Sequence, residues 1–314
     1  MNIRNLLALS MINGIGPAFI KRNLSRIMTD NDCYSIIKEY KPEHEDEISL
    51  CLEQADIILE DCIENNIEVL SIMDQNYPSS LKEINDPPFI LFVKGNINLL
   101  KKCLAIIGTR HSTDLGNRIA EKLGAFFSKH YAICNGLVEG IDEHSIYVNG
   151  KIIPNVVGII SGGLCYEDTC SKKHIKVIND VLTAGGLIIS EFPPRVKEDK
   201  YSGAKASRIQ AGLSQGLILV QSSINGGSKY TISTFAKLGR SIGVIHFPSS
   251  EEYDNGSFEA NKLIVEKKEE GIAKVIGIKN NSKVKVKSIT VLQSKTDYTS
   301  FINNMSNDNL LFDF

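Results

Sequence analysis

A glycine-rich loop with an arginine and two hydroxyl side chains follows a short apolar run and is the first candidate site. Its sequence is Gly108-Thr109-Arg110-His111-Ser112. A glycine lets the backbone come close to a phosphate, and an arginine pairs with phosphate oxygens through two parallel N–H groups. The hydroxyls of Thr109 and Ser112 can donate to the same oxygens. The loop therefore predicts phosphate binding, and the structural alternative is a tight strand-to-helix turn with a surface arginine.

Three further loops repeat this pattern of glycines after an apolar run. The second contains Gly136 and Gly140 and ends at Asp142, an acid that could cap a helix or accept a hydrogen bond from a sugar hydroxyl. The third is Ser161-Gly162-Gly163-Leu164, and the fourth is Asn225-Gly226-Gly227-Ser228-Lys229. Backbone amides in such loops can form a concave site for anions. We expect all four loops to contribute to phosphate binding.

The elements that position these loops are predicted to be the strands and helices of a parallel β-sheet. Short apolar runs alternate with helical stretches, and the expected strands are 104–107, 131–134, 156–160, 187–190, 217–220 and 242–247. The runs are apolar at both alternations, so helices should cover both faces. Ligands of open parallel sheets bind beyond the carboxyl ends of the strands. The predicted fold class is α/β, with a Rossmann-like parallel sheet between two layers of helices.

A small helical domain is predicted ahead of this sheet, over residues 1–75. Apolar positions recur there at steps of three and four, as in the stretch from Leu50 to Ile63. The turn from Met11 to Pro17 contains two glycines and looks like a helix-hairpin-helix turn, whose amides can contact a DNA phosphate without reading sequence. The alternative is a packing turn with Pro17 at the first helical position.

Two further regions complete the predicted domain map. Prolines 78, 87 and 88 predict an extended connector between residues 70 and 100. The Rossmann-like core is then expected over residues 76–270. Residues 271–314 are expected to form a short C-terminal extension of one or two strands and a loose tail, because lysines alternate there with apolar residues before a polar stretch.

The composition gives the protein no net positive charge that would attract DNA. The 314 residues include 35 Lys and Arg against 37 Asp and Glu, a formal net charge of -2, so nucleic-acid binding must depend on a local patch. The seven cysteines form no Cys-x-x-Cys pair, which favours reduced thiols in the cytoplasm. We recognise no signal peptide and no apolar run of membrane-spanning length, and therefore expect a cytoplasmic protein without membrane contact.

Metal and cofactor binding are not expected. Cys165, Cys170 and His174 match no closed zinc site and lack a fourth ligand. The sequence shows neither paired carboxylates nor a Ser, His and Asp order that would suggest hydrolytic chemistry. A binding protein is therefore favoured over an enzyme.

A series of motifs between residues 77 and 265 follows the order found in one known family. The motifs are Tyr77-Pro78, Asp86-Pro87-Pro88, Gly95-Asn96, Gly108-Thr109-Arg110, Gly136-Leu137-x-x-Gly140-Ile141-Asp142, Gly163-Leu164, Ser190-Glu191-Phe192-Pro193, Ser207-Arg208-Ile209-x-Ala211-Gly212-Leu213-Ser214, Gly227-Ser228-x-x-Thr231 and Gly239-Arg240. In these motifs the chain resembles the DNA-processing protein A (DprA/Smf) family.

The resemblance implies a homodimeric protein that binds single-stranded DNA in DNA uptake and recombination and hands it to the RecA recombinase. It also implies that Arg110, Arg208 and Arg240 grip backbone phosphates together with the glycine loops. In particular, Arg208 is expected to meet a phosphate held by the Gly108 and Gly227 loops.

Two departures from the family pattern leave the ligand open. The family carries Arg-Asn-Arg where this chain has Ala206-Ser207-Arg208, and Lys205 could replace the missing arginine. The histidine four residues after the family's Gly-Ile-Asp aspartate is here Ile146. A weaker or different ligand is compatible with these changes.

The second hypothesis is a Rossmann-like sensor or hydrolase of a small nucleotide, for example one used in defence against phage. Related phosphoribohydrolases carry a Pro-Gly-Gly-x-Gly-Thr-x-x-Glu loop. In this chain the position of the glutamate is Thr234, which disfavours hydrolysis.

Overall fold

A nine-stranded sheet forms the centre of the computed structural model, which describes residues 3–29, 33–40, 42, 47–247 and 256–306. The strands lie in the order β1 (Glu68–Ser71), β2 (Ile90–Gly95), β8 (Leu187–Ser190), β7 (Val156–Ile159), β4 (Ala132–Asn135), β3 (Cys103–Gly108), β9 (Ser214–Gln221), β10 (Ser241–Ile245) and β11 (Ile289–Leu292). Every neighbouring pair from β8 to β11 is parallel, whereas β2 pairs antiparallel with both β8 and β1.

The six strands predicted from apolar runs are confirmed as β3, β4, β7, β8, β9 and β10. Their side chains are buried on both faces, as Ile106 and its β9 partner Ile218 illustrate at 0% exposure. Burial of both faces is the reason these strands are apolar without alternation.

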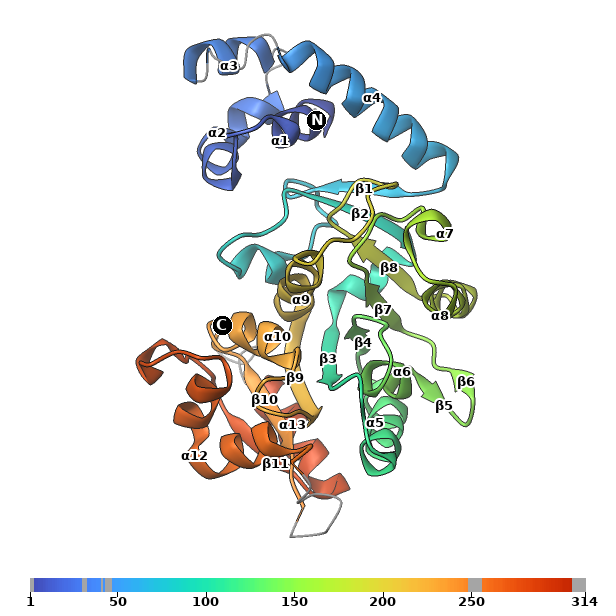
Figure 1. Ribbon diagram of the computed structural model, residues 1–314, viewed down its shortest axis with the longest axis vertical. Coiled ribbons are helices and arrows are strands. Elements are labelled where there is room, and N and C mark those ends of the chain that lie inside the picture. The colour runs from blue at the N-terminus through green and yellow to red at the C-terminus, as the bar shows by residue number, and fades with distance from the viewer. Residues whose placement is uncertain (1–2, 30–32, 41, 43–46, 248–255, 307–314) are drawn as a thin grey trace, which may run out of the picture.

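Helices cover the two faces of the sheet in separate groups (Figure 1). On one side lie α5 (Asp114–Phe127), α6 (Ile141–Ile146) and α8 (Lys172–Thr183), and on the other lie α9 (Ser202–Leu213), α10 (Ser228–Phe235) and α12 (Glu259–Val275). The chain moves outward from β3 to β8 in one direction and from β9 to β11 in the other. Because parallel crossovers are right-handed, the two directions place their helices on opposite faces. The predicted fold class is confirmed.

The N-terminal residues are helical, as predicted. They form α1 (Ile3–Met11), α2 (Pro17–Thr29), α3 (Cys33–Tyr40) and α4 (Ile48–Glu64), which lie beyond β1 and β2 at the top of Figure 1. A tight turn with Gly14 at φ 80° joins α1 and α2. One apolar core joins Leu6 of α1 to Leu91 of β2. The helical part ends at Glu64, because β1 already belongs to the sheet, and its ability to fold alone stays a prediction.

The connector expected between residues 70 and 100 contains the end of β1 and the whole of β2, so part of it belongs to the sheet. Its prolines are fixed by packing, since the buried Tyr77 hydroxyl donates to the Pro88 carbonyl at 2.6 Å. The described residues also form short elements: 3₁₀ turns at Ser79–Glu83, Ile97–Lys101 and Asn281–Lys283, the hairpin of β5 (Tyr147–Val148) and β6 (Lys151–Ile152), and α7 (Tyr166–Thr169).

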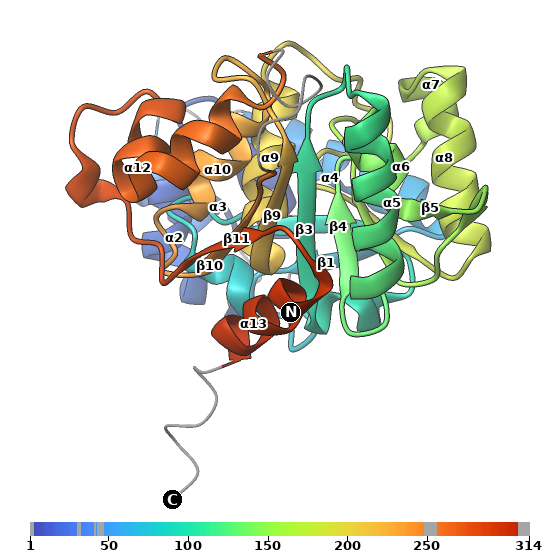
Figure 2. The same cartoon turned by 90° about the horizontal axis from the view of Figure 1, so that it is seen from below.

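The C-terminal extension differs in part from the prediction. It supplies one strand, β11, and then α13 (Lys295–Ser306), so the polar stretch is helical as far as Ser306 rather than a loose tail. The helix forms because Tyr298 and Phe301 are buried, with the Tyr298 ring 5.1 Å from that of Phe126 on α5. Figure 2 shows α12 and α13 on opposite sides of β10 and β11. The last part of the predicted tail, residues 307–314, lies outside the described residues.

Candidate functional site

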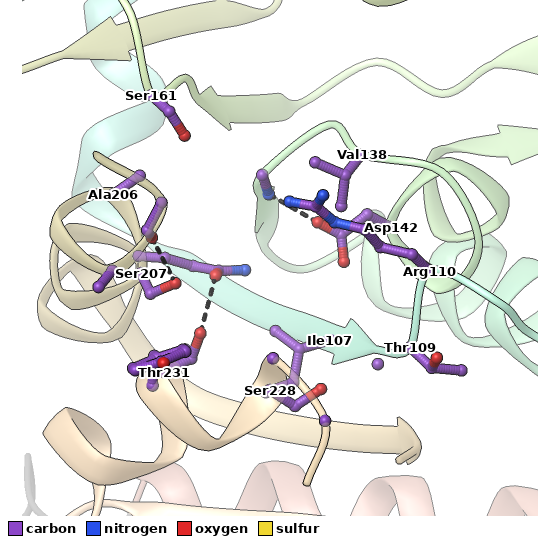
Figure 3. A pocket seen from close by; sticks show the side chains of 18 of the residues that line it. Ile107, Thr109, Arg110, Val138, Asp142, Ser161, Ala206, Ser207, Ser228 and Thr231 are labelled. Atoms are coloured by element: carbon purple, nitrogen blue, oxygen red, sulfur yellow. Dashed lines mark hydrogen bonds between the residues drawn. The ribbon is translucent and has the colours of Figure 1, made fainter. Parts of the chain in front are cut away.

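A cavity of about 790 Å³ lies at the carboxyl ends of β3, β4, β7 and β9 (Figure 3). The loops after β3 and β9 form part of its lining, together with the first turns of α9 and α10. Strands β3 and β9 are neighbours whose following helices, α5 and α10, cover opposite faces of the sheet. Such a switch point leaves a crevice between the two loops, where ligands of open α/β sheets bind.

Half of the sequence-predicted site residues line this cavity. They are Gly108, Thr109, Arg110, Gly136, Asp142, Gly226, Gly227 and Ser228. They come from three of the four predicted loops. The other eight predicted site residues do not line the cavity: Ser112, Gly140, Gly162, Gly163, Lys205, Arg208, Lys229 and Arg240.

The N-terminus of α10 offers unused hydrogen-bond donors to the cavity. Its entry turn is fixed by bonds from the Gly226 amide to Ser223 O at 3.1 Å and from the Tyr230 amide to Gly227 O at 3.1 Å. The amides of Gly227 and Ser228 donate to no atom in the described part of the chain. The Ser228 hydroxyl is buried and also lacks a partner among the described residues. Unsatisfied donors at the positive end of a helix form an anion site.

Arg110 supplies a cation at the same cavity. Its side chain is exposed and makes no hydrogen bond or ion pair within the described residues. Figure 3 shows Arg110 extending over Asp142 on one side of the cavity, with Ser207 and Thr231 on the other. A guanidinium without a protein partner remains available to a ligand.

Asp142 is a buried carboxylic acid in this lining. It accepts a hydrogen bond from the Gly136 amide at 2.8 Å and is the second residue of α6 rather than its cap. Burial raises the pKa of Asp142 to about 7, against the opposing effects of the Gly136 bond and the nearby Arg110. A carboxyl group that is partly protonated near neutral pH repels a bound anion less than a carboxylate does.

Gly140 holds the Asp142 loop against the Arg110 loop without entering the cavity. Its φ is 81°, and an added Cβ would lie 2.4 Å from the Thr109 carbonyl oxygen. Only glycine fits such a close approach in this conformation.

The third loop faces a different neighbour from the one expected. The Gly163 amide donates to Val196 O at 2.7 Å, and an added Cβ on Gly163 would lie 2.1 Å from Pro193 O. Of Ser161, Gly162 and Gly163, only Ser161 lines the cavity. The glycines of the third loop therefore accommodate the 193–196 segment.

Arg208 was expected to meet a phosphate between the Gly108 and Gly227 loops, but in the structure its side chain pairs with two acids and does not line the cavity. Its guanidinium donates to both oxygens of Glu191 at 2.9 and 2.7 Å, and its Nε donates to Asp86 at 2.8 Å. The side chain is only 16% exposed. This geometry joins α9 to the end of β8 and to the connector.

Arg240 likewise serves the protein's own backbone. Its Nη1 donates to the carbonyls of Ala211, Gly212 and Ser214 at the end of α9, and its Nη2 donates to Ser80 O and to Glu83. A cation is favourable at a helix C-terminus, where carbonyl groups lack partners. Arg240 is therefore a helix cap in this structure.

The remaining predicted residues outside the cavity have local partners. The Ser112 hydroxyl bonds to Asn117 next to the start of α5. The ammonium groups of Lys205 and Lys229 lie over the rings of Phe192 and Tyr230, at 5.1 and 5.5 Å from the ring centres.

The sequence predicted Lys205 and Arg208 of α9 as site residues, whereas the lining comes from other residues of this helix and from the two residues before it. The cavity contacts Lys200, Tyr201, Gly203, Ala204, Ala206, Ser207 and Gln210. The available signal was the position of Ala206, where the resembled family carries an arginine. Gln210 is fixed between the Cys134 carbonyl, which accepts at 3.0 Å, and the Thr231 hydroxyl, which donates at 3.3 Å.

The described residues contain no cluster of three or more His, Cys, Asp or Glu side chains that could hold a metal ion. The six cysteines whose side chains are described are free thiols. Within the ranges that the structure covers, no helix is both long and apolar enough to span a membrane.

Residues 68–280 match the family described as DNA recombination-mediator protein A. The chain belongs to this family. It is 31% identical to the DNA processing protein DprA of Bacillus subtilis (strain 168) over 196 residues, which is 62% of this chain and 65% of that relative. It therefore spans less than two thirds of the length of this family member. The resemblance seen in the sequence motifs is confirmed.

Two solved structures of family members share the fold. The X-ray structure of DNA processing protein A from Streptococcus pneumoniae has a TM-score of 0.63 at 22% identity and covers 96% of this chain and 93% of that one. A structure from Helicobacter pylori has a TM-score of 0.54 at 24% identity, with 64% and 87% coverage. The Helicobacter structure is described as giving insight into that protein's single-stranded DNA binding mode.

Proposed function

We propose that this chain binds single-stranded DNA by its backbone phosphates. The observation that carries the proposal is the set of unused donors at one cavity: the amides of Gly227 and Ser228, the buried Ser228 hydroxyl and the Arg110 guanidinium. Backbone amides and a guanidinium recognise the phosphate group and carry no information about the base. Binding is therefore expected to be nearly independent of sequence.

Lysines around the cavity extend the positive region beyond a single phosphate. Lys200 belongs to the lining, and Lys205 and Lys229 lie on the first turns of the two helices that border it. A strand whose phosphate occupies the start of α10 would place its neighbouring phosphates near these ammonium groups. Affinity should fall with salt, because each neutralised phosphate releases counterions. The local patch explains how a chain with net charge -2 can bind DNA.

Family membership and the single-stranded DNA binding mode of the Helicobacter protein support this proposal. The proposed biological role is DNA uptake and recombination, in the cytoplasm. The proposal includes a homodimer and transfer of the bound strand to a RecA-type recombinase, both of which rest on the family resemblance.

A small nucleotide is the second candidate ligand, and the volume of the cavity favours it. About 790 Å³ lies within the range of small-molecule pockets. Such a site would make the chain a nucleotide sensor, for example in phage defence. Hydrolysis receives little support, since Asp142 is the one carboxylic acid among the described residues that line the cavity.

Competition binding separates the two candidates. Labelled oligo-dT is titrated with the full chain, and unlabelled mononucleotides and longer strands then compete. Single-stranded DNA binding predicts that affinity rises with strand length and varies little among base compositions. Tight binding of one mononucleotide, with no gain from longer strands, would overturn the proposal in favour of the nucleotide site.

A further inference from the structure

Two exposed tyrosines border the cavity at the starts of the two helices that line it. Tyr201 immediately precedes α9 and is 61% exposed, and Tyr230 lies in the first turn of α10 and is 50% exposed. Seven large hydrophobic side chains are exposed in the described part of the chain, and these two are the aromatic ones. Both belong to the cavity lining. An exposed aromatic ring at a polar cavity is a feature that neither folding nor phosphate binding requires.

We propose that Tyr201 and Tyr230 are stacking platforms for two nucleobases of the strand whose phosphate is held at the start of α10. This inference rests on the proposed function and adds the class of chemical group that the cavity rim recognises. Stacking on a tyrosine ring suits any base, because every base has a π-face. The two tyrosine rings thus add affinity for the strand without a preference for its base sequence.

The position of Tyr230 connects base stacking to the phosphate site. Tyr230 is two residues after Ser228, and its amide donates to Gly227 O at 3.1 Å, so its backbone belongs to the turn that presents the free amides. A base stacked on this ring would belong to a nucleotide adjacent to the held phosphate. Because α9 packs against α10, the start of α9, which Tyr201 precedes, is held close to the same turn.

Each tyrosine also carries a lysine at one face of its ring. Lys200 Nζ lies 4.8 Å from the centre of the Tyr201 ring, and Lys229 Nζ lies 5.5 Å from the centre of the Tyr230 ring. Each lysine is the sequence neighbour of its tyrosine, so the ammonium group and the ring lie side by side at the edge of the cavity. A nucleotide offers the matching pair of groups, since its base stacks and its phosphate carries the negative charge.

Oligonucleotides with and without bases test this inference. Affinity is measured for oligo-dT and for an abasic strand of the same length, with the wild-type chain and with the double variant Tyr201→Ser and Tyr230→Ser. We expect wild type to bind oligo-dT more tightly than the abasic strand, by on the order of 10-fold for each ring. The double variant should bind both strands with the wild-type affinity for the abasic strand. The matched double variant Tyr201→Phe and Tyr230→Phe retains both rings and should behave as wild type.

Fluorescence gives a second measurement that does not depend on affinity. The chain contains no tryptophan, so Tyr230→Trp introduces a single reporter at the proposed platform. Stacking predicts that oligo-dT quenches this tryptophan and that the abasic strand at saturation does not.

Three results would overturn the inference. One is wild-type affinity of the Tyr→Ser double variant for oligo-dT, and another is an equal loss on oligo-dT and the abasic strand, which would indicate damage to the phosphate site. In both cases the proposed function survives. Failure of wild type to bind either strand would overturn the proposed function and this inference together.

Discussion

The guanidinium of Arg208 and the carboxylate of Glu191 form a two-bond ion pair, with Nη1 to Oε1 at 2.9 Å and Nη2 to Oε2 at 2.7 Å. Their side chains are 16% and 12% exposed, so the pair is largely shielded from water. The pair connects the end of β8 to α9, and Asp86 adds a contact to the connector. The arginine that the sequence motifs predicted to grip a phosphate is thus occupied by two acids of its own chain.

The variant Arg208→Ala is therefore expected to lose stability rather than DNA affinity. Removing one member of a buried pair leaves an uncompensated charge and costs about 3 kcal/mol of unfolding free energy. Chemical denaturation measures this loss. Glu191→Ala should cost a similar amount, and the double variant less than the sum, because the two residues interact directly. Weaker binding of oligo-dT by a folded Arg208→Ala of unchanged stability would contradict this assignment.

Ser228→Ala should show the opposite behaviour. Its hydroxyl is buried without a partner in the described residues, so removal deletes no hydrogen bond of the free protein and the unfolding free energy should not fall. Affinity for oligo-dT should fall by about 10-fold, the value of a hydrogen bond to a charged group. Ser207→Ala is the matched control, because that cavity hydroxyl already donates to Gly203 O at 2.8 Å. Equal affinities of the two variants would argue against phosphate contact at Ser228.

The free energy of unfolding should depend on pH through the protonation of Asp142. Its pKa is raised by burial from the usual 3.8 to about 7, so the folded state binds this proton more tightly than the unfolded state does. The stabilising contribution is complete below about pH 4 and is lost as the pH rises through about 7. Carboxylates with lowered pKa, such as Asp199, act in the reverse direction. The difference in unfolding free energy between wild type and Asp142→Asn isolates the effect, and a difference that does not vary over this interval would refute it.

Arg110→Ala should weaken DNA binding and make it less dependent on salt. One lost phosphate contact lowers the slope of log affinity against log salt by about one. Titrations at several salt concentrations measure the slope. Arg118, exposed on α5 and outside the cavity lining, provides the matched control for loss of a positive charge. Equal slopes for the Arg110 and Arg118 variants would remove Arg110 from the proposed site.

The core strands and the glycine loops were predictable, because residues close together in the sequence determine them. The core strands are apolar at both alternations, and the glycines mark loops at strand ends. The partners of Arg208 were not predictable, because Glu191 and Asp86 lie 17 and 122 residues away. A sequence motif places an arginine on a helix but does not show which way its side chain points.

Which residues of α9 line the cavity was unpredictable for a related reason. Tyr201 reaches the lining because β9 pairs with β3, so that α9 crosses the sheet on the face opposite α5. Strand order of this kind depends on pairings between distant segments. The helix α13 was missed because its burial of Tyr298 and Phe301 also depends on distant partners, among them Phe126 and Phe127 of α5.

Two substitutions of Gly227 test whether the amides at the start of α10 hold a DNA phosphate. Gly227 has φ −61°, which a proline can adopt, and an added Cβ would meet no atom within 4 Å. Gly227→Pro therefore removes the N–H group, whereas Gly227→Ala keeps it. We predict that Gly227→Pro binds oligo-dT about 10-fold more weakly than Gly227→Ala, with both variants folded by circular dichroism. Equal affinity of the two variants would contradict phosphate binding by these amides.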